Sequence, residues 1–272
     1  MKHLPLIALL LVACPSCSLV LEDRQECPAF VYFHRDQDSE PGDFDRVLVK
    51  VMDGETMEEL FADDLLLEKL CSESYSIAIP KRKEILSCGV SGARVSTLVG
   101  NSLMLPAGYQ GDPVYRFVKK DRLVGEEFHV PARFTKEFSR VLVRFKSDDG
   151  VFPYDVVVTG NTSGMDITTG MPIEGVFRYK PPETEPGVYR FTVPRQCDYS
   201  LSLELWTTPG SKSGEEEHVD DVVLWNALQN IKGFSWAMES LPDLTIEIDY
   251  VKASVTVLIS DWNISSTTNY IL

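Results

Sequence analysis

The amino-acid sequence predicts an all-β protein built from sandwiched sheets. Short runs of β-branched and aromatic residues recur along most of the 272-residue chain, and several alternate between apolar and polar side chains. Alternation with a period of two is typical of strands that bury one face. Glycine and proline separate these runs, as at Gly108, Gly150, Gly160, Pro182 and Gly187. Many short strands with such turns favour a β-sandwich.

The first half of the chain contains three expected strands and one ambiguous segment. The strands are Phe30–Phe33, Val47–Val51 and Tyr75–Ile79, the last ended by Pro80. The ambiguous segment begins at Thr56-Met-Glu-Glu59, which has the form of a capping box, and continues with Leu60, Phe61, Leu65, Leu66 and Leu67. The residues alone leave both helix and strand open there.

The second half repeats the strand pattern. Its expected strands are Val141–Phe145, Tyr154–Val158, Tyr189–Val193, Leu201–Leu205, Thr245–Tyr250 and Ser254–Ile259, with a short helix near residues 222–231. Each half opens with a similar strand, and in each half a later strand ends in Ile-Pro or Val-Pro (Ile79-Pro80, Val193-Pro194). Together with a change in composition near residues 130–138, this parallel predicts two sandwiches in tandem.

The N-terminus has the features of a bacterial lipoprotein signal. Met1-Lys2-His3 forms a short basic region, and Leu4–Ala13 forms an apolar run of about ten residues. This run is too short to span a bilayer, which needs about 20 residues, and it fits a signal sequence. It ends in Leu11-Val12-Ala13-Cys14, the form of a lipobox whose Cys thiol receives the lipid.

Two cysteines compete for the acyl group. Cys14 has the better preceding residues, whereas Cys17 follows Cys14-Pro15-Ser16, a poorer lipobox. The lipobox therefore favours Cys14, with Cys17 left as a thiol in the tail. We expect the mature chain to be held at the membrane by acyl chains rather than by a spanning helix.

The other cysteines are candidates for disulfides. Cys27, Cys71, Cys88 and Cys197 lie in the exported part, where an oxidising compartment permits disulfide formation. Four cysteines allow three pairings, and the sequence does not choose among them. Because none has zinc-site spacing with a histidine, and the single Cys-x-x-Cys lies in the signal region, we expect neither a metal nor a redox site.

Charge and motifs exclude several functions. The chain has 26 Lys and Arg against 41 Asp and Glu, for a net charge of −15, so we expect no nucleic-acid partner. No nucleophile elbow, zinc-protease motif or phosphate-binding loop occurs. His34, His129 and His218 are scattered, and Ser91 in Gly-Val-Ser-Gly has no evident partner residues. We therefore expect a non-enzymatic protein without a cofactor or small-molecule substrate.

Some polar and aromatic clusters allow a second interpretation. Residues 36–43 have alternating oxygens like a calcium loop, but Pro41 replaces the required glycine and the closing Glu is missing, which favours a solvated acidic loop. The acidic runs 215–217 and 220–221 are read the same way. Sugar-binding platforms use tryptophans, and this chain has Trp206, Trp225, Trp236 and Trp262, although core packing is the simpler interpretation.

Three segments resemble the FimB-like anchor subunits of Bacteroidales type V fimbriae. The tail from Cys17 through Glu22-Asp23 to Cys27-Pro28 resembles the family's start, with a lipidated Cys, an acidic pair and Cys-Pro. Val193-Pro-Arg195-Gln196-Cys-Asp198 resembles its Pro-Arg-x-x-Asp segment. Residues 243–250 and 254–262 resemble its closing pair of strands. The order and spacing of these segments cover nearly the whole chain.

The resemblance implies a fold and a set of boundaries. It implies two tandem transthyretin-like Greek-key β-sandwich domains, with strand rather than helix at residues 56–70. The expected division is a signal peptide over residues 1–16 (ending at 13 or 16), a tether over 17–27, and sandwiches over 28–133 and 134–272. The family register places the lipid on Cys17, three residues from the lipobox choice of Cys14, and both stay open.

The resemblance also implies a function. The expected protein is an anchor at the base of a fimbrium, tethered to the outer membrane by lipid and bound to a fimbrial stalk subunit by strand addition. Ala29–His34 or Ser254–Asp261 would supply the joining strand, because both are apolar, alternating and near a chain end. The alternative is a surface lipoprotein that binds glycans or adheres in another way.

Overall fold

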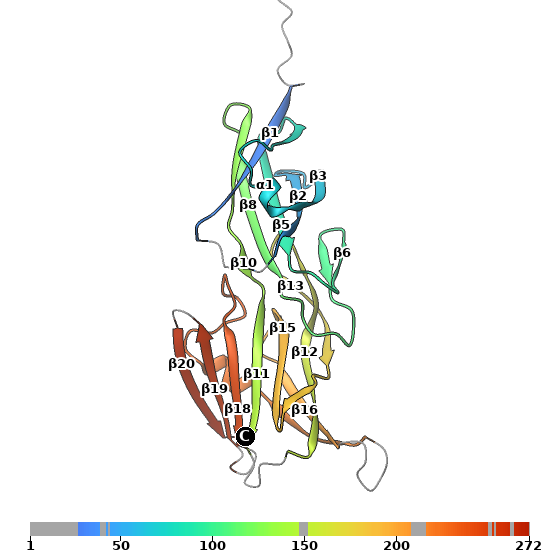
Figure 1. Cartoon of the computed structure of the whole chain (residues 1–272), viewed down its shortest axis with the longest axis vertical. Helices are drawn as coiled ribbons and strands as arrows, with labels where there is room; N and C mark the ends of the chain where they lie inside the picture. Colours follow the sequence, from blue (N-terminus) through green and yellow to red (C-terminus); the bar gives the residue numbers. More distant parts are fainter. Residues whose placement is uncertain are drawn as a thin grey trace, which may run out of the picture.

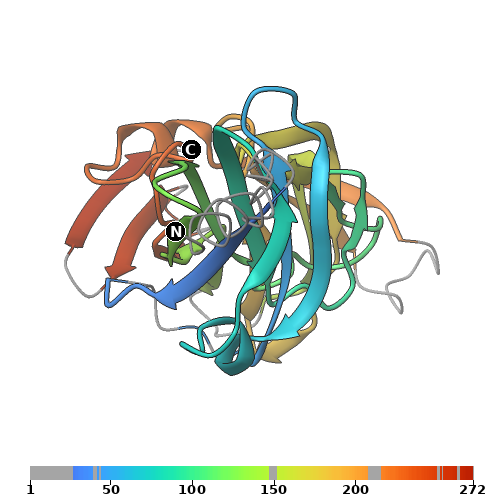
Figure 2. The ribbon, with the colours of Figure 1, turned by 90° about the horizontal axis from the view of Figure 1, so that it is seen from above.

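The computed structural model describes residues 27–38, 42, 44–146, 152–207, 216–249, 252, 254–261 and 264–271, with side chains up to Ile259. The prediction of an all-β protein is confirmed, since strands account for most of these residues. The described residues form four sheets, arranged as an elongated body with the first half above the second in Figure 1. Figure 2 looks down the long axis and shows strands of the first half lying over those of the second.

The first half contains two sheets that face each other. The three-stranded sheet has the order β4-β1-β9 and the five-stranded sheet the order β10-β8-β5-β2-β3. The strands are β1 (Pro28–Arg35), β2 (Arg46–Asp53), β3 (Glu59–Leu66), β4 (Ile77–Pro80), β5 (Glu84–Ser91), β8 (Tyr115–Arg122), β9 (Glu127–Ala132) and β10 (Thr135–Lys136), with the helix α1 (Leu67–Leu70).

A continuous apolar core lies between these two sheets. Phe117 of β8, Phe128 of β9 and Val49 of β2 are each at most 2% exposed, and they belong to a single cluster of packed side chains. Phe117 packs edge-on against Phe134, with ring centroids 5.1 Å apart. Gly89 of β5 allows this packing, because a Cβ at that position would lie 2.2 Å from the Phe117 ring.

The second half has the same two-layer arrangement with larger sheets. One sheet has the order β14-β15-β11-β18-β19-β20, and the other has the order β17-β16-β12-β7-β6, with β13 also paired to β12. The strands are β6 (Thr97–Val99), β7 (Ser102–Met104), β11 (Phe138–Lys146), β12 (Tyr154–Asp166), β13 (Pro172–Tyr179), β14 (Glu183–Glu185), β15 (Val188–Pro194), β16 (Ser202–Thr207), β17 (His218–Val223), β18 (Asp243–Asp249), β19 (Ser254–Asp261) and β20 (Ile264–Ile271).

The helix α2 (Trp225–Asn230) and the segment after it close one side of the second core. Ala227 and Leu228 of the helix, together with Phe234 and Trp236 beyond it, pack into the same cluster as β11, β15 and β18. The short helix expected near residues 222–231 is therefore confirmed, although residues 222–223 belong to β17. Neither helix in the described part of the chain is long and apolar enough to cross a membrane.

The capping-box interpretation of residues 56–59 is wrong, and the strand alternative is confirmed for Glu59–Leu66. The carboxylate of Asp53 accepts hydrogen bonds from the backbone N–H groups of Glu55 and Thr56 at 2.8 and 2.9 Å. These bonds from Thr56 and Glu55 hold the pKa of Asp53 below its usual range. They shape a hairpin turn that returns the chain as β3 beside β2, leaving helix only over Leu67–Leu70.

One hairpin crosses from the first half of the sequence to the second half of the structure. β6 and β7 fall within residues 28–133, but Ser102–Met104 of β7 pairs with β12 opposite Gly164–Asp166. Leu103 of the hairpin, Met165 of β12 and Ile167 just after β12 form a third apolar cluster together with Met52 and Cys88 of the first half. The division into two domains at residue 133 stays a prediction, and this hairpin crosses that boundary.

Candidate interaction site at the junction of the two halves

The predicted lipidation sites, Cys14 and Cys17, lie outside the described residues. The four candidate disulfide cysteines are all free thiols in the structure and lie in different surroundings. Cys88 is fully buried, and burial raises the pKa of its thiol to about 12. Cys197 is exposed and donates to the Asn161 carbonyl at 3.4 Å. Disulfide formation by Cys27, Cys71, Cys88 and Cys197 stays a prediction.

His34 and His129 line one surface pocket, and the structure separates His218 from both. His129 stacks on Tyr32 at a centroid distance of 5.3 Å, while His218 lies against Trp206 in the other half. Within the described ranges, no group of three His, Cys, Asp or Glu side chains could hold a metal ion. Part of the calcium-like segment 36–43 lies outside those ranges.

The tryptophans do not form a common platform. Trp206 is half-buried beneath Arg178, and its indole N–H donates to Glu204 at 3.0 Å. Trp225 lies beyond the opposite end of the β16–β17 ladder, since Trp206 pairs with His218 whereas Ser202 pairs with Val223. Trp236 is 4% exposed and belongs to the core. Trp262 lies outside the described residues.

Both strands expected to join a neighbouring subunit are already paired on each side. β1 lies between β4 and β9, and β19 lies between β18 and β20. Neither has an unpaired edge for a further strand, so the hypothesis that Ala29–His34 or Ser254–Asp261 joins the neighbour is wrong for this conformation. The sheet that contains β18 and β19 ends at β20, the last strand that the structure describes.

The junction between the halves centres on Glu137, the residue between β10 and β11. β10 belongs to the five-stranded sheet of the first half, and β11 belongs to the sheet of the second half that also contains β15 and β18. The Glu137 backbone N–H donates to Val114 in the first half at 3.0 Å, and its carbonyl accepts from the Arg195 N–H in the second half at 3.1 Å. The backbone of one residue therefore connects both halves.

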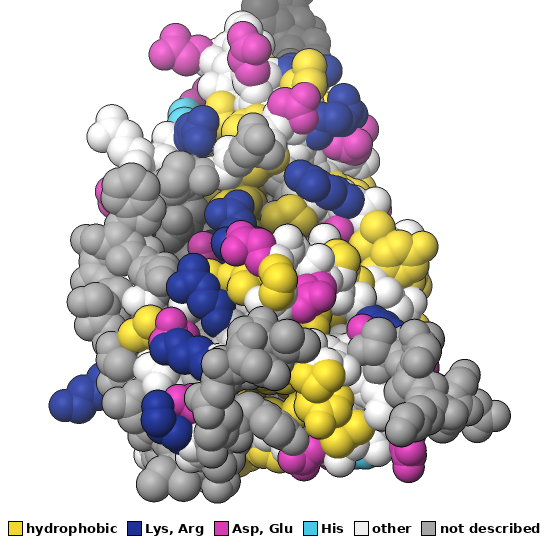
Figure 3. All heavy atoms as spheres, turned by 60° about the horizontal axis from the view of Figure 1, so that its bottom comes forward, with side chains coloured by type: hydrophobic (Ala, Val, Ile, Leu, Met, Phe, Trp, Pro, Cys, Tyr) yellow, Lys and Arg dark blue, Asp and Glu magenta, His cyan; other side chains and the backbone are white. Residues whose placement is uncertain are grey.

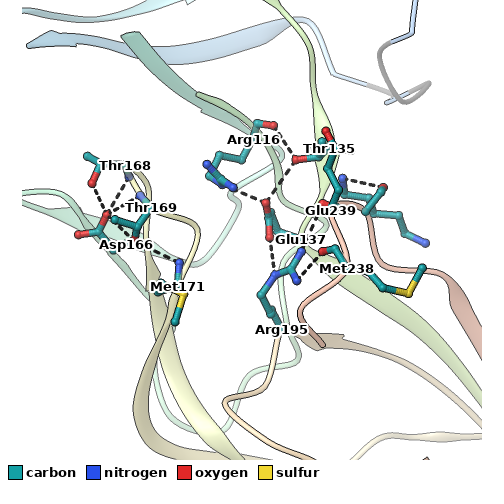
Figure 4. A network of polar contacts seen from close by, with 12 residues as sticks. Arg116, Thr135, Glu137, Asp166, Thr168, Thr169, Met171, Arg195, Met238 and Glu239 are labelled. Atoms are coloured by element: carbon teal, nitrogen blue, oxygen red, sulfur yellow. Dashed lines mark hydrogen bonds and ion pairs between the residues drawn. The ribbon is translucent and has the colours of Figure 1, made fainter. Parts of the chain in front are cut away.

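The Glu137 side chain also connects the two halves, because its carboxylate forms ion pairs with an arginine from each half, as Figure 4 shows. Its carboxylate accepts from Arg116 Nε of β8 at 2.9 Å and from Arg195 Nε at 2.7 Å. The Glu137 side chain is 1% exposed, and those of Arg116 and Arg195 are 12% and 8% exposed. Charges buried to this degree require partners, because removing them from water costs several kcal/mol for each ion.

Arg195 also fixes the segment that follows α2. Its Nη1 donates to the carbonyls of Trp236 and Met238, and its Nη2 donates to that of Glu239 at 3.5 Å. Next to it, Lys136 forms an ion pair with Asp243, and the Lys136 backbone N–H donates to Ser240 Oγ. Residues 136–137, where the chain passes between the halves, are thus bonded to two segments of the second half, Arg195 after β15 and residues 240–243 before and at the start of β18.

A turn in the second half positions a glycine against Arg116. Asp166 Oδ1 accepts from the backbone N–H groups of Thr168 and Thr169 at 2.8 and 3.0 Å (Figure 4). Gly170 closes this turn with φ of 73°. A Cβ on Gly170 would lie 2.2 Å from Arg116 Nη2, so the glycine leaves the space that the guanidinium occupies.

A cavity of about 600 Å³ opens beside this junction. It is lined by the start of β2, the end of β5, the loop over residues 92–96, the β6–β7 hairpin and Arg140 of β11. Its size lies within the usual range for ligand sites, and such sites often occur where two folded units meet.

The outer face of the sheet that contains β11 and β18 is less suited to binding an apolar partner. Arg144 lies opposite Glu247 on the neighbouring strand β18, with 3.9 Å between their charged atoms, and Lys146 contacts the same carboxylate at 2.7 Å. On the face drawn in Figure 3, basic and acidic side chains are intermixed in the same way. Exposed pairs of this kind contribute little to stability and keep a surface solvated.

Sequence reasoning missed Glu137, Arg116 and the cavity. Arg195 was singled out only as part of a segment that resembles a family, with no role assigned to it. Its partner Glu137 lies 58 residues earlier in the sequence. In the sequence, Glu137 is only a charged residue before an expected strand. Such residues are common in exposed turns, so its burial could not be predicted.

The chain matches no known protein-family model and no curated protein. Solved structures share its fold, among them the following three. A Bacteroides thetaiotaomicron protein, described as a candidate polysaccharide-binding protein, aligns with a TM-score of 0.62 at 17% identity, covering 90% of this chain and 98% of that one. The fimbrial anchor protein Mfa2 from Porphyromonas gingivalis aligns with a TM-score of 0.59 at 14% identity, covering 88% and 100%. A candidate adhesin from Bacteroides ovatus aligns with a TM-score of 0.59 at 13% identity, covering 89% and 96%.

At these identities the likeness shows a common fold. The alignments extend over most of this chain and nearly all of each neighbour, so the similarity includes both halves. The all-β sandwich fold that the resemblance to fimbrial anchor subunits implied is therefore confirmed, and its division into two tandem domains stays a prediction.

Replacing Arg195 with Ala should lower the free energy of unfolding by about 3–5 kcal/mol, because Glu137 loses one partner while it and Arg116 stay buried. Urea unfolding monitored by tryptophan fluorescence measures this. Lys120→Ala is the matched control, since its pair with Glu84 is 2.8 Å long but its side chain is 55% exposed; we expect a loss of at most about 1 kcal/mol. Equal losses in the two variants would contradict the role assigned to the buried charges.

Gly170→Ala should destabilise the protein more than Gly100→Ala. Both glycines have positive φ, 73° and 61°, so each substitution introduces backbone strain of about 1–2 kcal/mol. Only at Gly170 would the new methyl group collide with Arg116, whereas nothing lies within 4 Å of a Cβ at Gly100. Urea midpoints of the two variants measure the difference, and indistinguishable midpoints would argue against a contact between Gly170 and Arg116.

Proposed function

We propose that this protein is a non-enzymatic fimbrial or adhesive protein of the cell surface. The observation that carries the proposal is the fold shared with Mfa2, described as a fimbrial anchor, over 88% of this chain and all of that one. A candidate adhesin aligns over a similar extent. These structural neighbours are described as fimbrial or adhesive proteins rather than as enzymes.

Within that class, we propose the role of an anchor subunit. The lipid would attach to Cys14, which the lipobox favours, or to Cys17, where the resemblance places it, and a tether to Cys27 would follow. Cys27 immediately precedes β1, which begins at the upper end of the elongated body in Figure 1. A tether entering at one pole leaves the rest of the body directed away from the membrane. Several acyl chains together provide stable attachment.

The fimbrial stalk subunit would then bind by strand addition to β20. This strand ends a six-stranded sheet, and its outer edge is not paired with any described strand. An added strand would gain backbone hydrogen bonds along eight residues, Ile264–Ile271. Such an edge invites pairing with another chain unless it is covered.

The alternative function is a glycan-binding or otherwise adhesive lipoprotein. The fold shared with a candidate polysaccharide-binding protein favours it. The separation of Trp206 from Trp225 counts against an aromatic platform made by these two residues. A glycan array with the purified protein distinguishes the two functions.

Substitution of the two tail cysteines should identify the anchor. We expect that either Cys14→Ala or Cys17→Ala, but not both, abolishes acylation and releases the protein from the membrane fraction, because one thiol receives the lipid. Mass spectrometry of the membrane-extracted protein locates the acyl group, and the other variant serves as the control. An acylated, membrane-bound protein in both variants, or no acylation in the wild type, would refute a lipid anchor at these residues.

Proline substitutions at Thr267 and Thr268 should test strand addition to β20. Neighbouring N–H groups of a strand point to opposite edges, so one proline removes a bond to β19 and the other blocks the outer edge. We expect the edge-blocking variant to unfold within about 0.5 kcal/mol of the wild type but to lose co-purification of the stalk subunit from cells.

The other proline variant, which loses a hydrogen bond to β19, is recognised by its lower free energy of unfolding. Undiminished co-purification with the stable variant would show that β20 is not the joining edge. The lipid anchor would still stand in that case, because it is tested separately.

A further inference from the structure

The cavity beside the junction has an aliphatic floor. Leu48 of β2 and Leu98 of β6 are half-buried and line it, and Val90 of β5 and Leu103 of β7 lie beneath, at 3% and 4% exposed. The cavity therefore lies between the outer face of the five-stranded sheet and the hairpin that crosses from the second half.

The position of the cavity follows from incomplete coverage of that sheet face. At one end, Met52 and Cys88 are covered by Met165 and Ile167, which completes the third apolar cluster. Leu48 lies on the same strand and face as Met52, four residues earlier, where it lines the open cavity instead. The same sheet face, on which the buried Lys50 lies between Leu48 and Met52, is thus covered at one end and accessible at the other.

Three guanidinium groups from different elements surround this floor. Arg46 begins β2, Arg94 lies in the loop after β5, and Arg140 lies on β11 of the second half. Their convergence is notable in a chain with a net charge of −15, where acidic side chains outnumber basic ones.

These arginines are incompletely neutralised. Arg46 pairs with Asp64 at 3.2 Å, and Arg140 lies 3.9 Å from Asp243 with its side chain 64% exposed. Arg94 is exposed and forms no ion pair with the carboxylates that the structure describes. Among the described residues that line the cavity, Asp45 and Asp64 supply the carboxylates, so the guanidinium groups exceed these carboxylates by one. Arginine offers planar, bidentate recognition of carboxylates.

We propose that the cavity binds an extended peptide segment of a partner protein, in which an aliphatic side chain is flanked by carboxylates. The aliphatic side chain would occupy the floor formed by Leu48 and Leu98, and the carboxylates would meet Arg94 and Arg140 at the rim. The partner would be a fimbrial subunit. Only this identification of the partner rests on the proposed function.

The lining favours a peptide over a sugar. Sugar rings bind against exposed aromatic faces, but the aromatic residues here are engaged with one another. Phe44 packs on Tyr115 at a centroid distance of 5.3 Å, and Tyr115 is 7% exposed. Because Arg140 belongs to the second half and Arg46 to the first, a bound segment would contact both halves.

Fluorescence anisotropy with purified protein and defined labelled peptides tests this proposal. The probe is an acetylated, amidated Glu-Val-Glu-Leu-Glu-Val peptide. Two matched peptides replace either every Glu with Lys or every apolar residue with Ser, and a galacturonate trisaccharide is tested as a competitor. We expect saturable binding of the first peptide alone, weakened as the salt concentration rises above about 0.15 M, and no competition by the trisaccharide.

Protein variants connect the binding to the cavity. Arg94→Ala and Arg140→Ala should each weaken binding about two- to fivefold, as expected for partly exposed ion pairs. Ala93→Trp should abolish it by filling the cavity, because Ala93 is an exposed lining residue. Arg122→Ala is the control and should leave binding unchanged, since Arg122 lies at the far end of β8 from Tyr115 with its side chain 85% exposed.

Three outcomes would overturn the proposal: no binding of the acidic peptide, binding unaffected by the Arg94 and Arg140 variants, or displacement of the peptide by the trisaccharide with the same arginine dependence. The titration requires neither lipid nor an assembled fimbrium. Failure of the anchor role would therefore appear in the acylation and co-purification experiments and leave this measurement interpretable.

Discussion

Glu137 connects the two halves of the molecule through its backbone and its side chain at once. Its N–H and carbonyl bond to Val114 and Arg195, and its carboxylate contacts Arg116 and Arg195. Because these three charged groups are almost fully buried, their ion pairs form only when both halves hold the arginines at hydrogen-bonding distance. The relative position of the halves is thereby tied to the internal geometry of each, and so is the cavity that lies between them.

This arrangement has a mechanical consequence if the protein is an anchor. Tension between the tether before β1 and a subunit bound at β20 would pass from the first half to the second at residues 136–137. Just beyond, β11 lies centrally in its sheet, antiparallel to β15 and parallel to β18. Pulling on this strand would shear two ladders of hydrogen bonds together with the ion pairs of Lys136 and Glu137. A flexible linker at the same place would transmit force without fixing orientation.

The all-β class and many strands were predictable because burial of one sheet face imposes alternation. In β15 and β18 buried residues alternate with half-buried ones, or with the exposed Arg190. β5 was missed because Cys88 and Gly89 interrupt the pattern, although Gly89 is needed to accommodate Phe117. β17 was interpreted only as a solvated acidic face, and it is indeed exposed, but as an edge strand. Edge strands bury little, so hydrophobic periodicity does not report them.

The site was less predictable because its residues meet only after long-range pairing. Arg195 illustrates what sequence could and could not provide: the Pro-Arg segment was recognised, but its partners lie at residues 137 and 236–239. The geometry explains why arginine occupies this position. Nε contacts the Glu137 carboxylate while Nη1 and Nη2 reach three backbone carbonyls, which requires donors fixed in one plane and pointing in different directions. The single ammonium of a lysine could not reach both sets of acceptors, so the charge alone does not define this residue's role.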